Sequence, residues 1–141
     1  MNLFLDSSVL LAACGSTRGA SRALFSHARP NDWTLLASPY VLSEVAVNLG
    51  HFPPAAATDW LQLRRQLALV DDIVCLDRIH LFPASKDRPI LFTALAWGSV
   101  LLTLDEADFA KLLGREFYGL EILRPADFFT RQRAAGRLQP A

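Results

Sequence analysis

Four acidic residues of this chain lie in or beside apolar sequence, namely Asp6, Glu44, Asp87 and Asp105. An unpaired charge is costly in such surroundings, so each of these carboxylates needs a partner. Carboxylates that gather in one place repel one another and tend to keep a proton, and a divalent cation relieves that repulsion. Because these ligands are all oxygens, Mg²⁺ or Mn²⁺ would suit them. The four acids therefore predict an acidic metal site.

Two of the four acids end strand-like apolar runs. Asp6 follows the run at 2–5, and Asp105 follows the run Val100–Leu104. In a parallel sheet, ligands bind beyond the carboxyl ends of the strands, where the strand order reverses. Two strands that each end in Asp therefore predict an acidic pocket at that edge. Each acid alone has a simpler explanation: Asp6 as an exposed turn residue, and Asp105 as one of several first-turn acids of the next helix.

The other two acids lie on or beside predicted helices. Glu44 is the only charged residue of the helix expected over 39–49, and it points away from the stripe that should face the core. That stripe consists of Leu42, Val45, Ala46 and Leu49. We expect Glu44 to face a cleft, although an ion pair with an arginine on a covered helix surface explains it equally well. Asp87 precedes the helix expected over 88–97, where Asp by itself is an ordinary cap.

Strand-like and helix-like segments alternate along the chain. Strands are expected near 2–5, 33–37, 73–76, 99–104 and 120–123. Helices are expected over 7–13, 19–28, 39–49, 54–69, 88–97, 106–113 and 125–134. This alternation indicates α/β units around a mainly parallel sheet of about five strands. Among the helix boundaries, Ser38 can cap the helix that begins with Pro39, and Gly50 suits the position after its last residue.

The bulk properties are those of one globular domain over residues 1–141. The composition is 52% hydrophobic and 20% charged, which excludes a disordered chain. No apolar run reaches the ~18 residues of a membrane span. The N-terminus has no basic segment and no small-residue cleavage site, because Asp6 interrupts the apolar stretch early, so we expect a cytoplasmic protein. The formal net charge is zero, so no global field draws the chain onto nucleic acid. Twelve of the fourteen cations are arginines, which suits phosphate contacts, although a codon bias explains the same fact.

Other kinds of chemistry have little support in the sequence. Cys14 and Cys75 have neither CxxC spacing nor a nearby His, so we expect buried free thiols. His27, His51 and His80 lack metal-binding spacing and are interpreted as surface or packing residues. The chain contains no GxxxxGK[ST], GxGxxG or GxSxG motif, so neither a phosphate-binding loop nor a nucleophilic serine is indicated.

The order of the motifs resembles that of the PIN-domain ribonucleases, and most of all the VapC-type toxins of bacterial toxin–antitoxin pairs. The similar segments cover nearly the whole chain. They are Leu5–Leu10, Ser38–Val45, Asp87–Leu91, Leu101–Asp105 with Asp108-Phe109, and Leu123–Phe129. One departure is Leu104, because the family often has a small or polar residue before its fourth acid.

The resemblance implies a three-layer α/β/α fold and a Mg²⁺- or Mn²⁺-dependent endoribonuclease. Asp6 would be the central metal ligand, completed by Asp87 and Asp105, and Glu44 would bind or orient the attacking water. Further residues are implied more weakly: Asp108 as an additional ligand, Ser8 and Thr103 as supports for a water or a carboxylate, and Arg18 and Arg22 as RNA contacts. The expected partners are an RNA substrate, a small antitoxin and a second copy of the chain, with inhibition of translation as the outcome.

Two other functions compete with this interpretation. A haloacid-dehalogenase-type phosphatase also begins with a strand that ends in Asp, but it needs a second Asp two residues later, where this chain has Ser8. A catalytically silent PIN-like module that binds RNA or protein is the stronger alternative. The presence of all four acids argues against it without excluding it.

Overall fold

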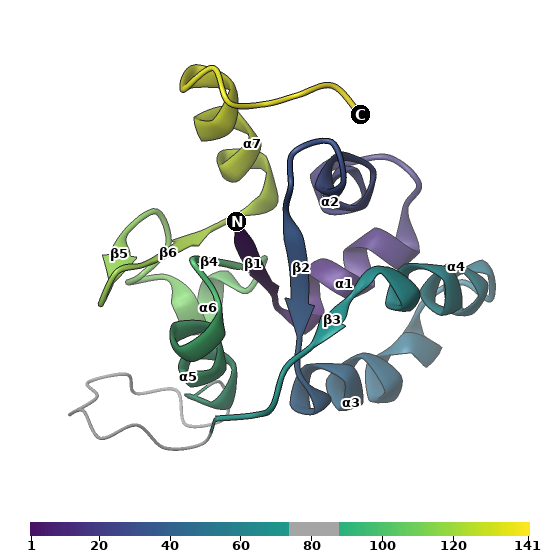
Figure 1. The fold of residues 1–141 in the computed structure, drawn as a ribbon. Helices are drawn as coiled ribbons and strands as arrows, with labels where there is room; N and C mark the ends of the chain where they lie inside the picture. The colour runs from purple at the N-terminus through teal and green to yellow at the C-terminus, as the bar shows by residue number, and fades with distance from the viewer. Residues whose placement is uncertain (74–87) are drawn as a thin grey trace.

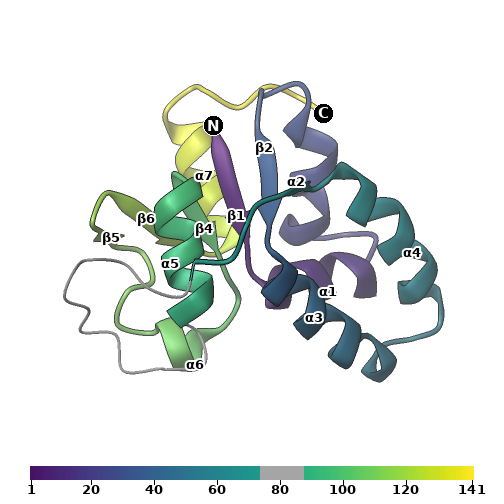
Figure 2. The same ribbon diagram turned by 60° about the horizontal axis from the view of Figure 1, so that its bottom comes forward.

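The computed structural model describes residues 1–73 and 88–141, in which helices cover both faces of a central sheet (Figures 1 and 2). The strands are β1 (Asn2–Leu5), β2 (Thr34–Ala37), β3 (Ala68–Leu69), β4 (Val100–Leu102), β5 (Glu116–Phe117) and β6 (Leu120–Leu123). The helices are α1 (Ser7–Gly15), α2 (Ala20–Ala28), α3 (Pro39–Asn48), α4 (Ala55–Leu63), α5 (Arg88–Trp97), α6 (Glu106–Phe109) and α7 (Pro125–Ala134), with 3-10 turns η1 (Leu49–His51) and η2 (Arg64–Gln66). The three-layer α/β fold with a mainly parallel sheet is confirmed.

The six strands of the described residues form one sheet in the order β3-β2-β1-β4-β6-β5. All neighbouring strands are parallel except β5 and β6. The chain first builds outward from β1 to β2 and β3, and then returns to the other side of β1 with β4. The strand order therefore reverses between β1 and β4, and the carboxyl ends of these strands flank the place where α/β folds bind ligands.

Helix α5 packs against β1 and β4 on one face of the sheet, whereas α2 and α7 pack against each other on the opposite face (Figures 1 and 2). Gly98 follows α5 and allows it to approach closely, because a Cβ there would lie 3.3 Å from the Cβ of Phe4 and 3.0 Å from the carbonyl oxygen of Ala94. Phe4 therefore faces the α5 side. Since side chains alternate along extended backbone, Asp6 points to that same face.

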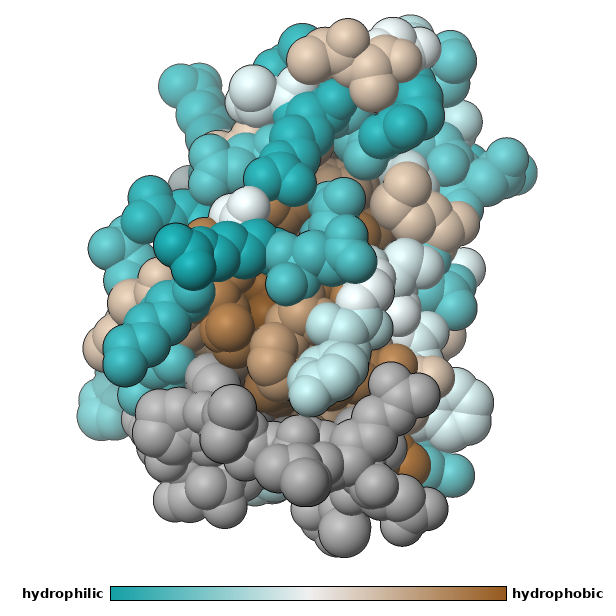
Figure 3. Space-filling view, turned by 90° about the vertical axis from the view of Figure 1, so that its left-hand side faces the viewer, coloured by the Kyte–Doolittle hydropathy of each residue, from teal (hydrophilic) through white to brown (hydrophobic). Residues whose placement is uncertain are grey.

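The central strands are buried on both faces, as parallel strands between two helical layers must be. Their buried side chains are Leu3, Phe4, Leu5, Val100, Leu101, Leu102, Leu120, Ile122 and Leu123. On the side that carries α5, α6 and β5, half-buried apolar side chains extend this core outward. Figure 3 views that side and shows hydrophobic side chains gathered in a hollow, with hydrophilic side chains lying across it. No helix of the described residues has the length and apolarity that a membrane span requires.

Two short strands of the six-stranded sheet, β3 and β5, were not predicted from the sequence. Both form because they pair with another strand. The helix predicted over 54–69 ends at Leu63, and β3 then pairs with the end of β2 at the edge of the sheet. Of the strand predicted at 73–76, only Ile73 is described, and it is not in a strand; the rest lies outside the described residues. The helix predicted over 106–113 ends at Phe109, and a short hairpin forms between β5 and β6.

Helix α3 begins at Pro39 with Ser38 as its N-cap residue, as predicted, but other groups than those expected complete its two ends. The hydroxyl of Ser38 makes no cap and has no hydrogen-bond partner, although the residue is buried. The carboxylate of Asp72 instead accepts the N–H of Tyr40 in the first turn, at 3.0 Å. At the other end, Gly50 does not stop the chain in a left-handed conformation, because the backbone continues into η1. Local sequence rules could not predict the role of Asp72, because it is 32 residues away from Tyr40 in the sequence.

Replacing Asp72 with Ala should lower the free energy of unfolding by about 1 kcal/mol, the usual cost of losing a helix cap. The reason is that the half-buried Tyr40 N–H loses its acceptor in the first turn of α3. Urea denaturation followed by circular dichroism measures this loss. Asp71→Ala is the matched control, since Asp71 is the exposed neighbour of the same type. Equal losses for both variants would contradict the assigned cap.

Candidate functional site

Asp6 follows β1 at the point where the strand order reverses. Its backbone N–H donates to the carbonyl oxygen of Leu102 at 3.0 Å, which continues the pairing of β1 with β4 by one residue. The residue is only 3% exposed, so the interpretation of Asp6 as an exposed turn residue is wrong. A buried carboxylate at this edge of the sheet needs hydrogen bonds or a cation to offset the loss of water.

Three neighbouring residues donate hydrogen bonds to the Asp6 carboxylate. Oδ1 accepts the backbone N–H of Ser7 at 2.7 Å, and Oδ2 accepts the hydroxyls of Ser8 at 2.8 Å and Thr103 at 2.6 Å. Backbone N–H groups fix the positions of both hydroxyls. Ser8 Oγ accepts the N–H of Leu104 at 2.9 Å, and Thr103 Oγ1 accepts the N–H of Asp105 at 3.0 Å. Ser8 and Thr103 therefore hold a carboxylate in place. The departure at Leu104 leaves these contacts intact, since only its backbone takes part.

Burial raises the pKa of Asp6 above its ordinary value, because the charged form loses water. The hydrogen bonds from Thr103, Ser8 and Ser7 oppose this rise in pKa, and the nearby charge of Asp105 adds to it. The net direction is upward. A raised pKa means that Asp6 stabilises the folded chain best when it carries a proton, or when a cation takes the place of that proton.

Ser7 joins the second acid to the first. Its hydroxyl donates to Glu44 Oε2 at 2.9 Å and lies 3.4 Å from Asp6 Oδ1. Glu44 is half-buried on α3, whose buried residues are Val41 and Val45. Glu44 therefore lies on the side of α3 that faces Ser7 and is linked to Asp6 through that residue. Ser7 was missed as a site residue, although its place directly after the first acid was a signal that could have identified it.

The expected core-facing stripe of α3 was only partly right. Val45 is buried, but Leu42 and Leu49 are half-buried and Ala46 is exposed. The face of α3 that is buried in the core is therefore narrower than its apolar sequence predicted. Glu44 lies outside this buried face and contacts Ser7 on α1.

Asp105 has a structural role beside the site. It is the N-cap residue of α6, and its Oδ1 accepts the backbone N–H of Asp108 at 3.0 Å. Asp105 is half-buried and close enough to Asp6 for its charge to raise the pKa of that residue. Asp108 is also half-buried, in the first turn of α6. The structure therefore brings Asp105 to the same edge as Asp6 while also giving it the capping function that the simpler explanation assigned.

Asp87, the remaining one of the four acids, lies outside the described residues. The C-terminal end of α5, the helix that follows Asp87 in the sequence, lies beside the start of β1. Asn2, the first residue of β1, donates its side-chain N–H to the carbonyl oxygen of Trp97 at 3.1 Å. Helix α5 thus ends at the amino edge of the sheet. Within residues 1–73 and 88–141, no three or more His, Cys, Asp or Glu side chains stand close enough together to hold a metal ion.

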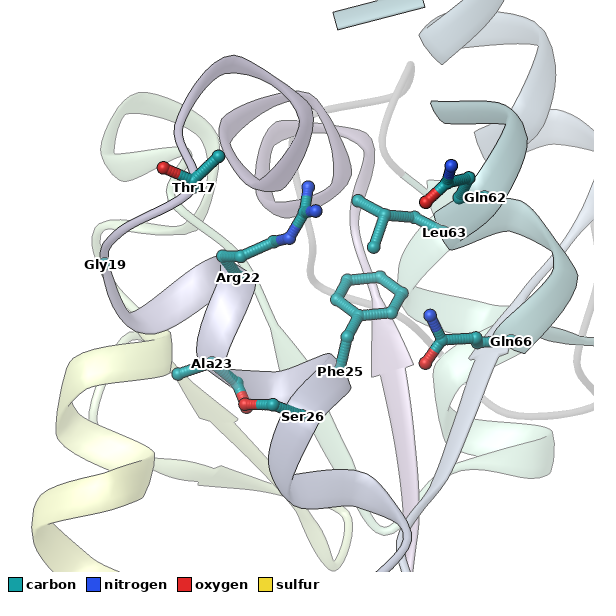
Figure 4. A pocket seen from close by; sticks show the side chains of 9 residues that line it. All are labelled: Thr17, Gly19, Arg22, Ala23, Phe25, Ser26, Gln62, Leu63 and Gln66. Atoms are coloured by element: carbon teal, nitrogen blue, oxygen red, sulfur yellow. The ribbon is translucent and has the colours of Figure 1, made fainter. Parts of the chain in front are cut away.

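The two arginines considered as RNA contacts differ in their surroundings. Arg22 Nη1 donates to Asp59 Oδ2 at 2.9 Å and to the carbonyl oxygen of Ala13 at 3.1 Å, so its guanidinium ties together α1, α2 and α4. Figure 4 shows Arg22 and Phe25 pointing into a pocket of about 450 Å³ between α2 and α4, and the described acids Asp6, Glu44 and Asp105 do not line that pocket. Arg18 is exposed on the segment before α2.

The histidines and cysteines of the described residues take no part in the acidic site. His27 packs edge-on against Phe129, and His51 is exposed. Cys14 is a buried free thiol whose pKa burial raises to about 11, so it is not a reactive thiolate at neutral pH. His80 and Cys75 lie outside the described residues.

Replacing Asp6 with Asn should stabilise the chain at neutral pH in the absence of divalent metal. Because the folded-state pKa of Asp6 is raised, its stabilising contribution is fully present below the unfolded pKa of about 3.9 and is lost as the pH rises through the folded pKa. Asn keeps the cap on α1 without carrying a charge. Melting temperatures measured in chelator from pH 4 to pH 8 should show an advantage of the Asn variant that grows with pH; a pH-independent difference would refute the buried-charge explanation.

Comparison with known proteins yields a structural likeness and no sequence match. Neither a protein-family model nor a curated protein matches the sequence. Among solved structures, the fold is similar to a chain in the crystal structure of VapBC2 from Rickettsia felis bound to a DNA fragment from its promoter. The TM-score is 0.60 at 14% sequence identity, and the match covers 86% of this chain and 97% of the other. At this identity the likeness shows a shared fold, and the chemistry must be argued from the site itself.

Proposed function

We propose that this chain is a metal-dependent PIN-type endoribonuclease and the toxin of a toxin–antitoxin pair. The observation that carries the proposal is the buried carboxylate of Asp6, which Ser7, Ser8 and Thr103 hold at the switch point of the sheet. Glu44 joins it through Ser7. The fold shared with the VapBC2 structure supports the same function.

The residues present fit a hard divalent cation. The donors gathered at the edge are carboxylate and hydroxyl oxygens, which Mg²⁺ and Mn²⁺ prefer. Burial raises the pKa of Asp6, and a cation bound to its two oxygens would offset the cost of burying their charge. Since the described residues do not by themselves complete a three-ligand group, the proposal includes Asp87 as a ligand with Asp6 and Asp105, and Asp108 as a further one.

The bound metal would supply Lewis-acid activation of water and stabilisation of the charge that develops on the scissile phosphate. The chain's own residues would do the positioning. Ser8 and Thr103 fix the orientation of the Asp6 carboxylate, because each hydroxyl donates to Oδ2 while its oxygen accepts a backbone N–H. Glu44 would accept a proton from the attacking water or orient it, and Ser7 holds the Glu44 carboxylate for that task.

The toxin assignment rests on the fold. VapBC2 of Rickettsia felis is a complex bound to a DNA fragment, and by analogy we propose that this chain pairs with a small antitoxin that controls its activity. Formation of a homodimer and inhibition of translation by RNA cleavage belong to the same proposal.

A catalytically silent PIN-like module is the second candidate. It is favoured by the fact that residues 1–73 and 88–141 hold no three-ligand group. A module of this kind would bind RNA or protein through the same edge and leave the RNA intact, so a cleavage assay distinguishes the two functions.

The purified chain should cleave single-stranded RNA in millimolar Mg²⁺ and lose this activity in chelator. Asp6→Asn should reduce the cleavage rate at least 100-fold while the protein stays folded, because the central carboxylate is lost. Asp127→Asn is the matched control, since Asp127 is an exposed aspartate in the first turn of α7. If the Asp6 variant cleaves RNA at the rate of the unmodified chain, Asp6 is not the central catalytic carboxylate. If the unmodified chain does not cleave RNA, the result favours the catalytically silent module.

Mg²⁺ should also raise the melting temperature of the unmodified chain. A ligand that binds only the folded state stabilises it by RT ln(1 + [L]/Kd), and relief of repulsion between the acids adds to this gain. Differential scanning fluorimetry over a Mg²⁺ titration measures the shift, which should vanish in Asp6→Asn. A flat melting temperature up to millimolar Mg²⁺ would argue against a formed metal site.

A further inference from the structure

The residues that directly follow the parallel strands lie in a row along the carboxyl edge of the sheet. Asp6 donates its N–H to Leu102, and Thr103 donates its N–H to Leu123 at 3.1 Å, so the ends of β1, β4 and β6 are in line. The next residue of this row is Arg124. With about 4.8 Å between strands, its Cα lies about 10 Å from that of Asp6, on the far side of Thr103.

We propose that Arg124 binds a backbone phosphate of the RNA beside the metal site, an inference that rests on the proposed ribonuclease function. Arg124 has extended backbone, so its side chain points to the same face of the sheet as those of Asp6 and Thr103. Its Nη2 lies 2.6 Å from Glu106 Oε1, at the start of α6 and next to Asp105. The guanidinium is therefore placed over the edge that carries the acids.

Arg124 is the single cation of this row in the described part of the chain. The residues that follow β1, β2, β3, β4 and β6 are Asp6, Ser38, Val70, Thr103 and Arg124. An acidic edge repels a polyanion, and a chain with zero formal net charge has no global field to offset that repulsion. A guanidinium beside the acids supplies a local attraction, and its planar fork matches a phosphate in a bidentate geometry.

The present partner of Arg124 can be displaced. The ion pair is exposed, with 44% of the Arg124 side chain and 65% of the Glu106 side chain accessible to solvent. Exposed pairs of this kind contribute little to stability, so a phosphate can take the place of the Glu106 carboxylate. Glu106 thereby acts as a competitor for the phosphate, and its removal should strengthen binding through Arg124.

Another exposed ion pair among the described residues serves as a matched control. Arg131 Nη1 lies 3.4 Å from Glu121 Oε2, with 46% and 44% of the two side chains exposed. Glu121 pairs in register with Val100, at the start of β4 and therefore at the other end of the strand from Thr103. Arg131 thus matches Arg124 in charge, exposure and type of partner, but it is held towards the amino edge of the sheet.

The test measures the dissociation constant of a labelled single-stranded oligoribonucleotide by fluorescence anisotropy in chelator, and KM and kcat for its cleavage in Mg²⁺. R124Q should raise both the dissociation constant and KM by roughly 5- to 10-fold, leave kcat within about twofold, and lower the slope of log affinity against log salt by about 0.7. R124K should restore the salt slope but only part of the affinity. R131Q and E121Q should change the affinity by less than about twofold. Circular dichroism checks that each variant is folded.

Removing the competing carboxylate gives an effect of opposite sign. E106Q should tighten RNA binding by about two- to threefold, and this gain should disappear in the double variant E106Q/R124Q. The proposal is overturned if R124Q behaves like R131Q, or if E106Q tightens binding equally with and without Arg124. Failure of the proposed function has a different signature, because the unmodified chain would then show no Mg²⁺-dependent cleavage, whereas the Arg124 assignment is decided by differences between variants in chelator.

Discussion

The hydrogen bonds to the buried carboxylate of Asp6 are the interaction on which the site depends. A carboxylate with so little exposure must replace its water with other donors, and the chain supplies the Ser7 N–H and the hydroxyls of Ser8 and Thr103. Thr103 is 97 residues away in the sequence and reaches Asp6 only because β4 pairs directly with β1. The pairing of these two strands therefore forms the sheet and the acidic site at the same time.

The position of the second acid depends on α3 and on the residues that hold it. The Asp72 carboxylate accepts an N–H at the start of this helix, and Ser7 on α1 donates to Glu44 near its middle. A cap and a hydroxyl from two other segments thus fix the distance between Glu44 and Asp6. The hydrogen bond from the Asp108 N–H in the first turn of α6 fixes Asp105 in a comparable way. Asp6, Glu44 and Asp105 are therefore each held by hydrogen bonds, and the distances between these three acids follow from the packing of the elements that carry them.

Local patterns predicted most of the fold, because they report what single segments can do. Apolar runs identified β1, β2, β4 and β6, and Pro39 and Pro125 mark the first turns of α3 and α7. The two missed strands are only two residues long, and each owes its conformation to pairing with another strand. No segment of that length carries a period of its own, which is why the tail of the helix predicted over 54–69 was assigned wrongly.

The sequence by itself determined the acids, their order along the chain and the apolar strands that deliver two of them to one edge. Only the tertiary structure decided that Asp6 is buried, that Ser8 and Thr103 both donate to it, and that Ser7 reaches Glu44. It also decided that Arg22 is held among three helices while Arg124 lies beside the acids. The physical reason is that a residue type and its spacing specify which hydrogen bonds are available, whereas the packing of distant segments specifies which partner is within reach.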